Sequence, residues 1–200
     1  MVGPTTFGYQ NLGFGAGVAD QGVYQLIQSQ TVSGQANIDF TSIKESAYQL
    51  HIVHHTLEPA TDNALLSVRF YESGTLEDQG VYKETVQEML DAGNNEDTAI
   101  DIELRNNGSR NHIRVGENVG NASLEYGTGY FYIFNAGNSS FHTTVSQQSV
   151  GLTTTNEVLM GFGGGVLPQA STVDGFRLFD SNNASNYTGT VSLYGVKLWN

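Results

Sequence analysis

Three histidines within residues 51–55 form the densest group of potential metal ligands in the sequence. They lie in a run, residues 47–57, that alternates apolar and polar residues and so predicts a β-strand. On a strand, His51 and His55 share one face but stand about 13 Å apart, too far to grip one ion. A metal site would need a further ligand from a neighbouring strand. We expect hydrogen-bonded or interfacial imidazoles instead, with no metal and no cofactor.

Carboxylates could supply two further kinds of chemistry. An acidic group spans residues 96–103, and Asp62 stands beside Asn63, so both places offer hard oxygen ligands for calcium. Neither has the spacing of a defined calcium loop, and we expect a solvated acidic surface. Paired carboxylates could hydrolyse a glycosidic bond, but such a pairing is spatial and is not visible in a sequence. No residue is assigned as catalytic, and we expect the protein not to be an enzyme.

The other candidate motifs are weak. The glycine run at residues 161–165 lacks the Lys-Ser/Thr of a phosphate-binding loop, and we interpret it as a flexible strand end. Tyr126, Tyr130 and Tyr132 could stack on sugars, although alternate aromatic residues in a strand more often belong to a core.

The remaining pattern predicts an all-β protein. About ten short runs rich in β-branched and aromatic residues are separated by Gly, Asn and Ser turns, and no internal repeat is visible. This is typical of an antiparallel β-sandwich, and we expect a jelly-roll-like one. Residues 84–90 are the one stretch with good helix propensity, for at most two turns.

The sequence predicts how two pairs of strands are connected. Asn107-Gly108 favours a tight hairpin turn after the strand that includes residues 100–105. The strands at residues 47–57 and 65–71 form either one hairpin or two strands with a wider connection.

The chain divides into residues 1–22, an extended arm, and residues 23–200, a single sandwich domain. The arm mixes glycine with large apolar residues and shows no helix or strand periodicity. Because exposed aromatics are a liability on an isolated monomer, the arm either packs on its own domain or docks on a neighbour. The arm residues assigned to an assembly interface are Phe7, Tyr9, Leu12 and Phe14.

The last strand, residues 189–199, is apolar on both faces. Alternation sends Val191 and Leu193 to one side and Tyr194, Val196 and Leu198 to the other. Such a strand is typically central in a sheet, with the core on one side and a second layer or subunit on the other. We assign Val191 and Leu193 to the assembly interface, while alternation alone leaves the opposite assignment open.

Composition and charge exclude several classes of partner and bond. The net charge is −12, from 20 acidic and 8 basic residues, which argues against nucleic-acid binding. There is no cysteine and hence no disulfide. No run approaches the roughly 20 apolar residues of a membrane span, so we expect no membrane association.

The order of several segments resembles a family of marine tailed-phage virion proteins. These segments are SGQANIDFTS at 33–42, AYQLHI at 47–52, PATDNA at 59–64, GYFYIFN at 129–135 and GTVSLYGVK at 189–197. The resemblance covers roughly residues 30–200. The chain departs from it in the arm, in the acidic segment near Glu96 and in the terminal Trp199-Asn200.

The resemblance implies a β-sandwich structural component of the virion, assembled in the bacterial host cytoplasm, with no catalytic residue. We expect a capsid decoration (cement) or head-fibre protein that binds major capsid or tail proteins as a homo-oligomer, for example a trimer. The alternative is a tail-fibre or adaptor domain that binds host surface glycans. A glycan depolymerase ranks third.

Overall fold

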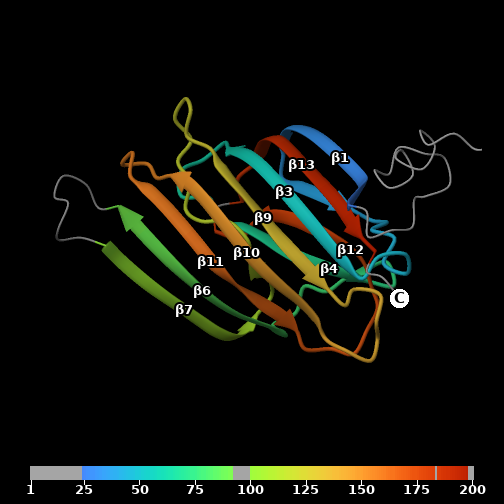
Figure 1. Ribbon diagram of the computed structural model, residues 1–200. Helices are drawn as coiled ribbons and strands as arrows, with labels where there is room; N and C mark the ends of the chain where they lie inside the picture. Colours follow the sequence, from blue (N-terminus) through green and yellow to red (C-terminus); the bar gives the residue numbers. More distant parts are fainter. Residues whose placement is uncertain (1–23, 92–99, 183, 198–200) are drawn as a thin grey trace, which may run out of the picture.

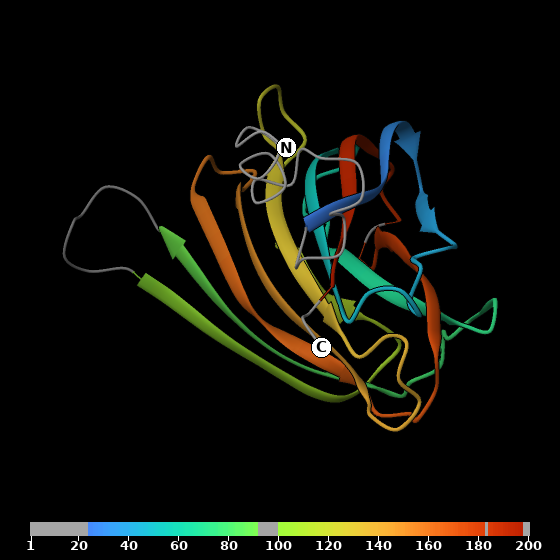
Figure 2. The ribbon, with the colours of Figure 1, turned by 45° about the vertical axis from the view of Figure 1, so that its right-hand side comes forward.

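The protein is an antiparallel β-sandwich of two sheets (Figures 1 and 2). The computed structural model describes residues 24–91, 100–182 and 184–197, with the backbone alone for 100–107. In this part of the chain all regular secondary structure is β-strand, and there is no helix. The predicted all-β sandwich is therefore confirmed, while the jelly-roll topology stays a prediction.

In the described residues, thirteen strands build the two sheets. They are β1 (Tyr24–Gln35), β2 (Asn37–Phe40), β3 (Leu50–Pro59), β4 (Leu66–Glu72), β5 (Thr75–Leu76), β6 (Tyr82–Asp91), β7 (Ile100–Arg110), β8 (Ile113–Arg114), β9 (Gly127–Phe134), β10 (Thr143–Leu152), β11 (Val158–Leu167), β12 (Val173–Asp180) and β13 (Tyr187–Val196). The large sheet has the order β1-β13-β3-β9-β10-β11-β6-β7. The small sheet has the order β2-β12-β4-β5, and β8 pairs with β4.

An apolar core fills the space between the sheets where β2, β12 and β4 face β13, β3 and β9. Phe176 lies at its centre, stacked on Phe40 at a centroid distance of 4.8 Å and edge-on to Phe131 at 5.9 Å. All three side chains are fully buried. The core joins residues that are far apart in sequence, as expected where alternate strand residues point inward.

The terminal strand β13 lies inside the large sheet, hydrogen-bonded to β1 on one side and to β3 on the other. Its central place was expected, but its two faces are reversed. Val191 and Leu193, assigned to an assembly interface, are fully buried in the core. Tyr194 and Val196 lie on the opposite, partly exposed side. Leu198 falls outside the described residues.

The expected helix at residues 84–90 is wrong, because this stretch lies within β6. Tyr82, Glu84, Val86 and Glu88 alternate as buried residues on one face. Hydrogen bonding to β11 on one side and β7 on the other outweighs the helix propensity of Glu, Gln, Met and Leu.

The two turn predictions resolve differently. Asn107-Gly108 makes no hairpin turn, because β7 continues to Arg110 and has one extra residue opposite Tyr82 and Glu84, which is a β-bulge. The strands expected at 47–57 and 65–71 are β3 and β4, which belong to different sheets. The wider connection left open by the sequence is the one observed.

The glycine run is a strand interior and not a flexible end. All of residues 161–165 pair with β10 on one side and β6 on the other. A side chain at Gly161 would place its Cβ 2.0 Å from a carboxylate oxygen of Glu117, and one at Gly165 would place it 2.9 Å from Ile113. Glycine therefore lets the segment 113–117 lie directly against β11.

Truncating Leu193 tests the corrected face of β13. We expect Leu193→Ala to lower the free energy of unfolding by about 2–5 kcal/mol, because it leaves a cavity in a fully buried core position. Thr190→Ala, an exposed change on the other face of the same strand, should cost about 0.5 kcal/mol or less. Urea unfolding of the two variants measures both values, and equal effects would contradict the assignment.

Candidate interaction face

The large sheet turns one face away from the small sheet, and we call this the outer face. Side chains from neighbouring strands line up across it in rows set by the strand register. One row runs Leu26, Tyr194, Ile52, Tyr132, and the next runs Tyr24, Val196, Leu50, Phe134. These eight residues, from β1, β13, β3 and β9, form what we call the apolar patch.

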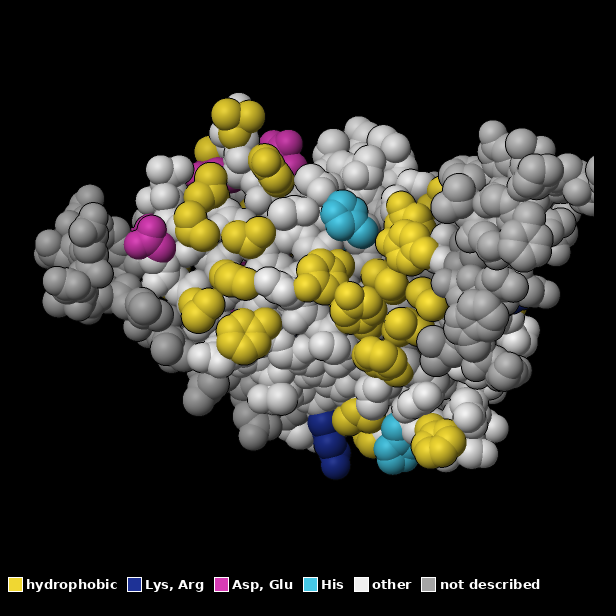
Figure 3. Space-filling view, viewed as in Figure 1, with side chains coloured by type: hydrophobic (Ala, Val, Ile, Leu, Met, Phe, Trp, Pro, Cys, Tyr) yellow, Lys and Arg dark blue, Asp and Glu magenta, His cyan; other side chains and the backbone are white. Residues whose placement is uncertain are grey.

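The apolar patch is partly exposed and built largely from rings. Tyr24 and Leu26 are 52% and 58% exposed, and Phe134 is 37% exposed. The Tyr24 ring stacks on Tyr194 with centroids 4.3 Å apart, and Tyr132 contacts Phe134 at 6.0 Å. Figure 3 shows apolar side chains gathered over these strands. Cross-strand ring pairs stabilise the sheet and leave their outer surfaces available to a partner.

Two hydroxyl-rich rows adjoin the apolar patch. One contains Ser29, Ser192, His54 and Tyr130, and the other contains Thr31, Thr190, Thr56 and Thr128. Hydroxyl pairs bridge neighbouring strands, with Oγ atoms of Ser29 and Ser192 2.9 Å apart. The hydroxyl of Tyr130 donates to Gln148 Oε1 at 2.7 Å. Beyond Gln148 the row continues to Phe162, which is 39% exposed.

The outer face is almost free of charge. From β1 through β13, β3, β9 and β10 to β11, Glu58 at the end of β3 is the one carboxylate among the described outward-facing residues, and none is Lys or Arg. Charge returns beyond this region, at Lys83 and Asp91 on β6. This uncharged face contrasts with the net charge of −12 of the chain.

The small sheet has a different outer surface. Arg177 on β12 forms a two-pronged ion pair with Asp39 on β2, at 2.7 and 2.9 Å. This hydrogen bonding raises the pKa of Arg177. Arg69 lies over the ring of Phe179 at 4.2 Å. The small sheet thus presents fixed charges where the large sheet presents rings and hydroxyls.

A buried group of charges lies between the sheets beneath β6 and β11. Arg114 Nη1 contacts Glu88 at 2.6 Å and Glu117 at 3.9 Å. The backbone N–H of Arg114 donates to Glu84 at 2.9 Å, and Arg110 lies 3.3 Å from the same carboxylate. The three carboxylates are at most 5% exposed. They serve to hold β8 in place and offer no open pair for a glycosidic bond.

The histidines occupy separate environments. His51 and His55 share one face of β3, as predicted, and this face is buried, while His54 is exposed. His51 Nε2 lies 2.8 Å from the Ile43 carbonyl, and burial lowers its pKa. Burial, with a smaller effect of His54, lowers the pKa of His55 to about 4. His112 also has its pKa lowered to about 4, by burial and then by Arg110 and Arg114.

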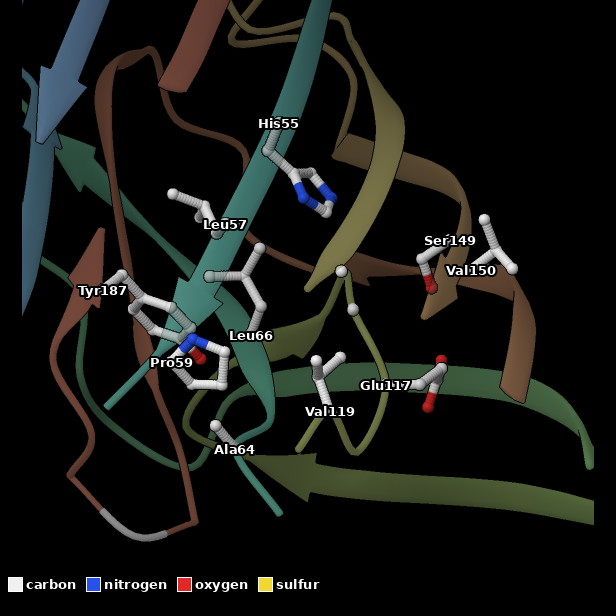
Figure 4. A pocket seen from close by; sticks show the side chains of 12 residues that line it. His55, Leu57, Pro59, Ala64, Leu66, Glu117, Val119, Ser149, Val150 and Tyr187 are labelled. Carbon is white, nitrogen blue, oxygen red and sulfur yellow. The ribbon is translucent and has the colours of Figure 1, made fainter. Parts of the chain in front are cut away.

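A small cavity between the sheets is shown in Figure 4. His55, Ser149 and Glu117 line one end, while Leu57, Leu66 and Tyr187 belong to its other, more apolar end. Its volume of about 20 Å³ admits roughly one water-sized molecule. A sugar or an organic cofactor does not fit there.

The other predicted site residues lie partly outside the described residues. Phe7, Tyr9, Leu12 and Phe14 lie outside the described residues, so their place in an interface stays a prediction. The acidic group falls partly outside too, and Asp62 accepts a hydrogen bond from the Asn121 N–H at 3.0 Å. Among the described side chains, no group of three or more His, Asp or Glu is placed to hold a metal ion.

Tyr130 and Tyr132 point outward, so their alternation reports the outer face and not the core. Tyr126, which is 48% exposed, precedes β9. The sequence analysis missed the apolar patch as a unit. Its signal was present in the uncharged outward positions of four strands, but their adjacency depends on the strand order.

Comparisons with known proteins identify no relative: no protein-family model, no curated protein and no solved structure matches. No helix able to cross a membrane occurs in residues 24–91, 100–182 and 184–197.

Removing the buried guanidinium of Arg114 should be severely destabilising. We expect Arg114→Met to lower the free energy of unfolding by about 3–5 kcal/mol, because it leaves buried carboxylates without their cation. Arg177→Met is the matched control, since the Arg177 and Asp39 side chains are 27% and 32% exposed and such a pair contributes about 1 kcal/mol or less. Chemical unfolding measures both, and similar losses would refute the distinction.

The buried His55 should make stability depend on pH. Its folded pKa of about 4 lies below the ordinary 6.5, so the unfolded chain takes up a proton first. Stability is therefore full above pH 6.5 and falls as the pH drops toward 4. Between pH 7 and 4.5 the loss due to His55 should be roughly 2 kcal/mol.

Urea unfolding at several pH values tests this contribution. His55→Gln should show a shallower pH dependence than the wild type by that amount. His54→Gln removes only the smaller effect of the exposed neighbour and should keep most of the wild-type slope. A wild-type slope in His55→Gln would contradict the prediction.

Proposed function

We propose that the protein is a structural, non-enzymatic component of a bacteriophage particle and docks through the outer face of its large sheet. The observation that carries the proposal is the lack of charge across six neighbouring strands of a strongly acidic chain. Within this uncharged face the apolar patch gathers eight apolar side chains on four neighbouring strands, and exposed apolar patches mark interaction sites. Depletion of charge with enrichment of aromatic residues is typical of the centre of a protein interface.

The phage setting rests on the resemblance of the segments at 33–42, 47–52, 59–64, 129–135 and 189–197. Among positions on a virion, capsid decoration or a head fibre suits one sandwich domain with a short arm. Major capsid or tail proteins would then be the partners, and the virion the location.

A second candidate is glycan binding, as in a tail-fibre or adaptor domain. Tyr130 and Tyr132 present their rings on the outer face 5.6 Å apart, and Gln148 lies beside them. Aromatic rings next to amide groups suit stacking and hydrogen bonding to a sugar. Glycan-array binding that is lost in Tyr130→Ala, without loss of fold, would favour this candidate.

Incorporation into particles tests the first candidate. In particles of the phage that encodes the protein, we expect Leu26→Glu to fold normally and to be absent, because a carboxylate in an apolar contact is costly to desolvate. Leu26 is 58% exposed, so the domain itself tolerates the change. Quantitative mass spectrometry of purified particles measures incorporation.

Phe141→Glu is the matched control. Phe141 is 60% exposed, but it lies in the loop between β9 and β10, outside the rows of the outer face. Normal incorporation of Leu26→Glu, or equal loss of both variants, would count against docking through this face.

A further inference from the structure

We propose that the apolar patch is a self-association surface, on which the patch of a second copy of this chain packs face to face. The inference rests on the proposed docking role of the outer face: the immediate partner of this face is a second copy, and the major capsid or tail proteins then bind the pair. Both halves of the contact are made of the same residues, so the pair has two-fold symmetry.

Charge selects a second copy over an oppositely charged partner. A basic partner would bind the acidic surface of this chain, where the electrostatic interaction is favourable. The uncharged face offers it no such interaction. A partner with the same net charge of −12 is repelled over most of the surface. The outer face is where two such copies meet without juxtaposing like charges, since Glu58 is its one described carboxylate from β1 to β11.

The arrangement of rows makes the patch self-complementary. The two apolar rows run side by side across β1, β13, β3 and β9. Consider a two-fold axis in the plane of the contact, parallel to the two rows and midway between them. Rotation about this axis places each row of the second copy over the other row of the first copy. Apolar side chains then meet apolar side chains, and the two sheets stack about 10 Å apart as in a sandwich.

The available area suits a stable contact. A large aromatic side chain carries on the order of 200 Å² of surface, and Tyr24 and Leu26 are more than half exposed. With the half-buried members, the patch offers on the order of several hundred Å² of apolar surface. The adjoining hydroxyl rows extend it toward the roughly 800 Å² that each partner gives to a standard interface.

Sedimentation of the full chain over a range of micromolar concentrations tests the inference. The wild type should form dimers or assemblies built from dimers, and raising the ionic strength should tighten them because salt screens the repulsion between acidic copies. Phe134→Glu should weaken association at least about 100-fold. Phe141→Glu, an equally sized change off the outer face, should associate like the wild type.

Circular dichroism melts of each variant check that the fold is kept. If Phe134→Glu does not fold, Leu26→Glu replaces it, since that residue is the more exposed. A wild type that stays monomeric throughout, or the same association in Phe134→Glu and wild type, overturns the inference. A monomeric protein whose incorporation into particles still depends on Leu26 refutes self-association and leaves the proposed docking role standing. If the protein forms dimers through the apolar patch but never enters particles, self-association stands and the proposed docking role is refuted.

Discussion

The ion group around Arg114 is the constraint on which one half of the sandwich depends. The small sheet covers the large one with apolar side chains mainly near β3, β9 and β13, and Phe70 of β4 also packs on Tyr82 of β6. Beneath β6 and β11 the covering layer is the segment 113–117, held by contacts of Arg114 with Glu88 and Glu117. Taking these charges out of water is unfavourable unless they stay paired, so the segment has little freedom to move.

The glycines of β11 make this ion group possible, because they leave room for the segment 113–117. Arg114 reaches its carboxylates because Ile113 and Glu117 lie against Gly165 and Gly161, where any side chain would collide. The polar half of the interior therefore requires glycine at positions 161 and 165 of β11, and the apolar half requires the stacked rings around Phe176. His55, whose pKa burial lowers to about 4, lines the small cavity together with Glu117 and Leu57.

The outer face follows from the order of strands. The neighbours β1, β13, β3 and β9 come from both ends and the middle of the chain, and each brings two apolar residues to adjacent rows. Ring contacts such as Tyr24 on Tyr194 tie the rows together. The surface proposed for docking is thus a product of the closure of the chain by β13, and the charged small sheet takes no part in it.

The sequence by itself determined most of the strands and the lack of charged residues along several of them. Alternation at residues 47–57, 129–135 and 189–199 correctly paired the residues that share a face, because the period of two is a local property of the strand. It could not say which face is inside. For Val191 and Leu193 the assignment to an interface was reversed, since direction depends on the layer packed above.

Only the tertiary structure decided the remaining features. Residues 84–90 became a strand because hydrogen-bonding partners stood on both sides, which local propensity does not register. The glycines at 161–165 appeared flexible in sequence, yet they sit in the sheet interior because a distant segment lies against them. The apolar patch and the Arg114 ion group likewise arise from long-range strand order, and no spacing along the chain encodes which strands become neighbours.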